Sequence, residues 1–265
     1  MNIFLHEMKA YRKSTIIWLV SLVGIMVFFM SMYPSFAKDA ESMTTMLKGY
    51  PESIRKVFSL DLENFFTILG FYCYLLTFIV LAGAIQAMNI GVSIVSKEVR
   101  EKTADFLLTK PVTRTTILTA KLLAAFVSLL ITNVIYSGAA LLMASQVKVE
   151  DFSSKVFLLL SLTLFIVQLL FLAMGIVISV VARKIKSVLT VSLATVFTFY
   201  FIGTLGGITG DETIRYFSPF KYVDTAYVMK HSGFEVSYLM VGVVLLAVAI
   251  FASYYVYSKK DIHAV

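Results

Sequence analysis

The sequence is short of charge, cysteine and histidine, and each shortage argues against a class of protein. Only 15% of its 265 residues are charged, whereas about a quarter are charged in an ordinary soluble domain. The single cysteine, Cys73, excludes an internal disulfide. The three histidines are scattered, and no zinc-protease, serine-hydrolase or Walker A pattern is present. We therefore expect no catalytic site, no metal site and no cofactor site in this chain.

Long apolar runs dominate the chain instead, with 59% hydrophobic residues and a mean hydropathy of +0.86. A helix needs about 20 apolar residues to cross the hydrocarbon core of a bilayer. We predict an all-α membrane protein that forms a single domain over residues 1–265, with an aromatic-rich outer segment at 209–236. Its six transmembrane helices are expected at 15–33, 65–95, 116–144, 155–182, 187–207 and 237–257.

The first 14 residues have the pattern of an amphipathic helix. Phe4, Met8 and Tyr11 share one face, and the basic residues fall on the opposite face. Such a helix lies in the membrane interface, with its basic face toward the lipid headgroups. The alternative is the positively charged start of a signal peptide whose apolar region is 15–33. We expect the interfacial helix, because the apolar run is long for a signal peptide.

The net charge of +7 does not need a nucleic-acid partner to explain it. Lys and Arg of membrane proteins collect on the cytoplasmic side. Of the 23 Lys and Arg residues, 14 fall in the N-terminus, the hairpin 96–121, the turn 183–186 and the C-terminal tail, whereas 11 of the 16 acidic residues fall in the three other loops. We therefore predict that both termini are cytoplasmic.

The hairpin between the second and third spans, 96–115, is the longest charge-dense interruption of the apolar runs. Glu98 and Lys102 are four residues apart and can bridge along a helix. Pro111 ends such a helix, and Thr113 can cap the start of the next one. The pattern predicts a short amphipathic helix. Spacing alone also fits a basic loop that is held by anionic lipid.

The run EVREKTADFLLTKPVTRTTILTAK in this hairpin resembles the signature of ABC-2 type permeases, the membrane subunits of one class of ATP-binding-cassette exporters. Thr103-Ala104 stands where Gly-Thr is usual in that family. The N-terminal helix is similar to the family's elbow helix, the six spans match its usual count, and Ser218-Pro219-Phe220 resembles an outer segment that dips back into the membrane in relatives. The residues that match the signature are Glu98, Glu101, Lys102, Leu107, Leu108, Pro111, Thr113, Arg114 and Lys121.

The resemblance implies a function. The chain would form an export pathway with a second permease subunit, the same or a related chain, in the bacterial cell membrane. A separate ABC ATPase, which holds the ATP and magnesium, would drive it through a cytoplasmic coupling helix. The residues implied in this coupling are Glu98, Arg100, Glu101, Lys102, Thr103, Asp105, Phe106, Leu107 and Leu108.

Four uncharged amides fall inside the predicted spans: Gln86, Asn89, Asn133 and Gln168. Such groups usually hydrogen-bond another helix, and contact with a substrate is the alternative. No Asp, Glu, Lys or Arg falls deep in a span, which argues against proton coupling and against an ion channel.

Small residues recur at the outer end of the fifth span, where Gly203, Gly206, Gly207 and Gly210 give overlapping GxxxG spacings. This pattern fits either close helix packing or a loosened helix end.

Two other functions stay open at this point. One is a membrane sensor or immunity protein that uses the same fold without transport, and the other, with less support, is an integral membrane enzyme.

Overall fold

The computed structural model describes residues 3–51, 64–100, 112–182, 184–209 and 212–259, and this part of the chain is helical without a strand. It does not describe the side chains of residues 41–43, 47, 98–100, 207 and 212. The predicted all-α fold is confirmed.

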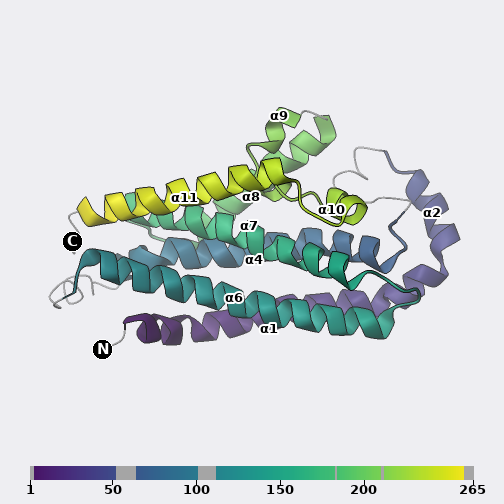
Figure 1. The fold of residues 1–265 in the computed structure, drawn as a ribbon, viewed down its shortest axis with the longest axis horizontal. Coiled ribbons are helices and arrows are strands. Elements are labelled where there is room, and N and C mark those ends of the chain that lie inside the picture. The colour runs from purple at the N-terminus through teal and green to yellow at the C-terminus, as the bar shows by residue number, and fades with distance from the viewer. Residues whose placement is uncertain (1–2, 52–63, 101–111, 183, 210–211, 260–265) are drawn as a thin grey trace.

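Within these described ranges, six helices are long and apolar enough to cross a membrane, as the apolar runs predicted. They lie side by side, and both chain ends lie at the same end of the bundle, which we call the termini side (Figure 1). The opposite side carries the short helix α2 (Ala40–Lys48). The six spanning helices are α1 (Ile3–Lys38), α4 (Ile68–Arg100), α6 (Arg114–Val147), α7 (Ser154–Val181), α8 (Val188–Thr209) and α11 (Val236–Lys259).

The N-terminal residues do not form the separate interfacial helix that was expected over 1–14. Helix α1 is continuous from Ile3 to Lys38. Nothing between Ile3 and Gly24 breaks a helix, because neither proline nor glycine occurs there. The apolar face is covered by protein rather than by lipid headgroups: Tyr11 is buried in the core, and Phe4 and Met8 pack against it.

The spanning helices form two close pairs. The most extensive contact is between α4 and α7, and the next is between α1 and α6. The backbones of α4 and α7 touch at Gly91 and Gly175, where a Cβ atom on Gly91 would lie 2.5 Å from the carbonyl oxygen of Leu172. Such close approach of two helices in a membrane needs small residues.

Helices α8 and α11 lie at the edge of the bundle. Only 17% of the residues in their most apolar windows are buried, against 61% for α4 and α7. Apolar faces exposed in this way suit contact with the hydrocarbon of a bilayer.

Between α8 and α11 the described residues form three short helices: α9 (Glu212–Arg215), η1 (Pro219–Lys221) and α10 (Thr225–His231). The Ser218 hydroxyl donates to the carbonyl of Phe199 at 2.8 Å. Phe199 lies ten residues before the end of α8, which is about 15 Å along the helix. The ring of Phe220 lies 4.9 Å from that of Phe171 on α7. The segment therefore turns back along the bundle to the middle of α8.

Candidate functional site

A layer of amide and hydroxyl side chains crosses the middle of the bundle and joins three helices. The Gln86 amide of α4 donates to the Thr132 hydroxyl of α6 at 3.3 Å. Gln168 of α7 donates to the Gln86 side-chain oxygen at 3.0 Å. The Asn133 amide of α6 in turn donates to the Gln168 oxygen at 2.5 Å. All four side chains are buried, so the layer links α6 to both members of the α4/α7 pair.

A second polar cluster lies nearer the opposite side. The Tyr72 hydroxyl of α4 lies 2.8 Å from the Ser161 hydroxyl of α7 and 3.4 Å from that of Tyr136 on α6. The Tyr72 ring stacks on Phe157 with 4.1 Å between centroids. The same three helices are thus bridged twice by uncharged groups.

Of the four amides singled out in the sequence, the structure brings Gln86, Asn133 and Gln168 together and leaves out Asn89. Asn89 is half-buried on α4 and takes no part in this layer. The layer satisfies most of its polar atoms internally, but the Asn133 side-chain oxygen is buried without a hydrogen-bond partner. Sequence reasoning did not find Thr132, because a threonine inside a span is too common to be a signal.

On the termini side, a buried ion pair joins α1 to α6. The Lys121 ammonium donates to the Glu7 carboxylate at 2.8 Å, and the two side chains are 2% and 9% exposed. Sequence reasoning had noted Lys121 only as a match to a family signature and had given Glu7 no role. Glu7 lies three residues from Phe4 and four from Tyr11, so its place on the apolar face of the helix was the available signal.

The two ends of the charged hairpin are anchored to different helices. At the end of α4, the Ser179 hydroxyl of α7 accepts hydrogen bonds from the backbone N–H groups of Val95 and Ser96, each at 3.1 Å. At the start of α6, the Thr113 hydroxyl caps the helix by accepting from the N–H of Thr116 at 3.2 Å, as predicted. The side chains predicted to couple, from Glu98 to Leu108, lie outside the described residues.

The glycines of the fifth span meet a neighbour in their own chain. A Cβ atom on Gly203 would lie 2.6 Å from the Ser218 hydroxyl oxygen, so Gly203 makes room for the segment that turns back along α8. Gly206 is partly exposed. The surroundings of Gly207 and Gly210 are not described. The spacing of the four glycines is therefore not evidence for a contact between subunits.

Arg215 holds this outer segment against α11. Its guanidinium donates to the Glu235 carboxylate at 2.6 Å and to the carbonyl of Lys221 at 2.9 Å. It also lies over the ring of Tyr238, 3.7 Å from the centroid.

In the part of the chain that the structure describes, no three His, Cys, Asp or Glu side chains come together to hold a metal ion.

The sequence matches the profile of a known family. The profile described as "ABC-2 family transporter protein" matches residues 1–262, almost the whole chain. No curated protein matches the sequence significantly.

Proposed function

Because the chain belongs to the ABC-2 family of transporter proteins, we propose that it is the permease subunit of an exporter that is driven by a separate ABC ATPase. In this role the chain is the membrane subunit, and the partner ATPase carries out the catalysis. It pairs with a second permease, the same or a related chain, to form the export pathway. ATP and magnesium belong to the partner ATPase, and the protein resides in the bacterial cell membrane.

The observation that carries this proposal is the arrangement of the two helix pairs around the charged hairpin. The hairpin connects α4, which is packed on α7, to α6, which is packed on α1. In Figure 1 its two ends lie on the termini side of the bundle. A partner that pulls on this hairpin therefore acts on the one covalent link between the pairs on that side.

The anchors at the two ends of the hairpin transmit such a movement into the spans. Ser179 fixes the end of α4 to α7, and the Glu7–Lys121 ion pair fixes the start of α6 to α1. Each pair can then move as a unit. A force on the segment 98–108 shifts the α1/α6 pair against the α4/α7 pair rather than bending a single helix.

The polar layer in the middle of the bundle lies where the two helix pairs would move against each other, and its hydrogen bonds are weak enough to allow this. Its hydrogen bonds join neutral groups, and such bonds between membrane helices contribute about 0.6 kcal/mol on average. They can therefore be exchanged for others when the pairs shift. ATP binding to the partner only biases two arrangements that the permease already populates.

The charge distribution supports the orientation. The described parts of the four segments that carry most Lys and Arg residues all lie on the termini side of the bundle (Figure 1). We place this side in the cytoplasm, where the ATPase is.

The test is whether an ATPase depends on the hairpin for its association with this protein. Glu101→Lys and Phe106→Ala are expected to reduce co-purification of the ATPase and its stimulation by the permease, while membrane insertion is unchanged. Asp261→Lys in the C-terminal tail makes the same charge change and serves as the control. If both hairpin variants bind and stimulate the ATPase normally, the coupling assignment is wrong.

A transport assay distinguishes an exporter from a sensor or immunity protein that has the same fold but moves no cargo. The exporter is expected to move material across reconstituted vesicles only with ATP and the ATPase. A permease that binds the ATPase but supports no ATP-dependent transport of any candidate cargo would count against the proposed function.

A further inference from the structure

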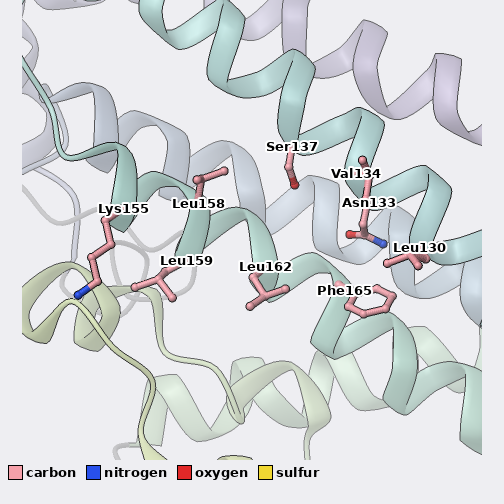
Figure 2. A pocket seen from close by; sticks show the side chains of 9 residues that line it. All are labelled: Leu130, Asn133, Val134, Ser137, Lys155, Leu158, Leu159, Leu162 and Phe165. Carbon is pink, nitrogen blue, oxygen red and sulfur yellow. The ribbon is translucent and has the colours of Figure 1, made fainter.

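A groove of about 480 Å³ runs between α6 and α7 on the surface of the bundle. Its walls are apolar, with Leu130 and Val134 of α6 beside Leu158, Leu162 and Phe165 of α7. Figure 2 shows that these side chains come from both helices, so the groove follows the seam between the two helix pairs. A groove in this place opens toward lipid rather than toward water.

The two ends of the groove are polar. Lys155 lies at one end and Asn133 at the other (Figure 2). Phe165 lies at the Asn133 end of the groove, ten residues after Lys155 on α7. The groove is therefore about 15 Å long along the helix axis. This length equals half of the hydrocarbon thickness of a bilayer, which is about 30 Å. The groove therefore has the polarity profile of a single leaflet, with a cation at headgroup level and polar atoms near the midplane.

The cation at the headgroup end is free to take a ligand. Among the described residues Lys155 forms no ion pair. The neighbouring Lys148 differs, because its ammonium is bound to Asp151 at 2.5 Å. That hydrogen bond lowers the pKa of the Asp151 carboxyl from its ordinary value.

The polar atoms at the deep end limit what fills the groove. Asn133, whose amide donates to Gln168 in the polar layer, closes this end, and the Ser137 side chain, one turn away on α6, is directed toward α7 (Figure 2). Hydrocarbon is a poor neighbour for a hydroxyl or amide group. A chain that enters from the Lys155 end is thus expected to stop before Asn133 rather than continue into the second leaflet.

We propose that this groove is a binding site for one acyl chain of an anionic phospholipid of the surrounding bilayer, whose headgroup pairs with Lys155. The site belongs to the leaflet on the side opposite the termini. The inference depends on the membrane fold and not on transport, so it stands or falls separately from the proposed function. A lipid held there would lie in the seam between the two helix pairs.

Fluorescence quenching by brominated lipids tests the site. The protein has a single tryptophan, so Trp18→Phe gives a dark background into which Leu158→Trp places a reporter in the groove. Met240→Trp on α11 is the matched control, because it lies on an exposed face and, like Leu158, four residues from the start of its helix. Each protein is placed in bilayers in which either phosphatidylglycerol or phosphatidylcholine is brominated.

A lysine at the headgroup level is expected to favour the anionic lipid by about five-fold in relative binding constant. This preference should appear with the groove reporter, be absent at the control position, disappear in Lys155→Gln and persist in Lys148→Gln. Equal quenching by both lipids would overturn the proposal. A preference that survives Lys155→Gln, or that appears equally at the control position, would also overturn it.

A second measurement avoids the tryptophan substitutions in case they disturb folding. Native mass spectrometry of the otherwise unaltered protein, released from nanodiscs that contain both lipids, should show retained phosphatidylglycerol that Lys155→Gln loses and Lys148→Gln keeps. Retention of the two lipids in proportion to their abundance in the nanodisc would contradict the site.

Discussion

The ion pair between Glu7 and Lys121 offers the sharpest prediction about stability. Lys121→Met removes the ammonium and keeps most of the side-chain volume. The Glu7 carboxylate, only 9% exposed, then stays buried without its cation. Breaking a buried pair by removing one partner costs about 3–5 kcal/mol, because an uncompensated charge remains. Solvent does not screen a pair buried to this degree, so the full range is expected.

The double variant Glu7→Gln/Lys121→Met isolates the interaction energy between the two charges from the separate effects of replacing each residue. Replacing both charges removes the uncompensated one, so the double variant should be more stable than Lys121→Met. A double-mutant cycle should therefore give a coupling energy of about 2 kcal/mol or more, within the upper range for groups in contact. Lys121 has a further interaction besides Glu7, so the double variant is not expected to reach wild-type stability.

The assay is reversible unfolding in mixed micelles, with the fraction of SDS as the denaturing variable and helix content as the signal. Lys148→Met is the control, since its partner Asp151 is 94% exposed and loss of an exposed pair has little effect. The reasoning is refuted if Lys121→Met unfolds like the wild type, or if the cycle gives a coupling energy near zero.

Three further substitutions test other parts of the structure. Gly91→Leu should destabilise the protein by about 1–3 kcal/mol through overpacking against α7, whereas Gly138→Leu, where an added Cβ meets nothing within 4 Å, should be tolerated; the same SDS titration compares them. Gln168→Leu removes two interhelix hydrogen bonds and should lower the free energy of unfolding by roughly 1 kcal/mol. If the two helix pairs move against each other at the polar layer, this variant should reduce ATP-dependent transport more than it reduces stability. Arg215→Gln should speed protease cleavage between α8 and α11 without changing the melting of the spans, and equal cleavage of both proteins would show that this arginine does not hold the segment.

The spans were predictable from the sequence because a helix in lipid has a simple requirement. It must present about 20 apolar residues, and a run of that length is visible without knowledge of its neighbours. The predicted third span, 116–144, and fourth, 155–182, differ from α6 and α7 by no more than three residues at any end. The side on which each loop lies then follows from the number of crossings.

The start of the chain shows where such reasoning stops. An amphipathic helix that lies in the interface and one that continues into a span have the same periodicity. Only the partner decides between them, and here α6 supplies the Lys121 ammonium for Glu7. The sequence pattern placed Glu7 on the apolar face of the helix, but nothing in the pattern identified the residue that it meets.

Glycine spacing in the sequence did not indicate which helices pack closely. The GxxxG pattern pointed to the fifth span, where Gly203 meets Ser218 of the same chain. A contact between two helix backbones lies instead at Gly91 and Gly175, which are far apart in the sequence and form no local pattern. Close approach is a property of two helices together, so a single span cannot reveal it. The coupling residues 98–108 remain a prediction from the sequence.

The side of the membrane on which the hairpin lies, and the partner that covers it, can be measured together. The native Cys73 is buried, so Asp105→Cys provides a single accessible thiol for a maleimide that does not cross membranes. We predict labelling in inverted vesicles but not in intact cells, and protection of that thiol when the ATPase is bound. Labelling of Asp105→Cys in intact cells, or a bound ATPase that leaves the thiol fully reactive in inverted vesicles, would contradict the claim that force enters this permease through its hairpin.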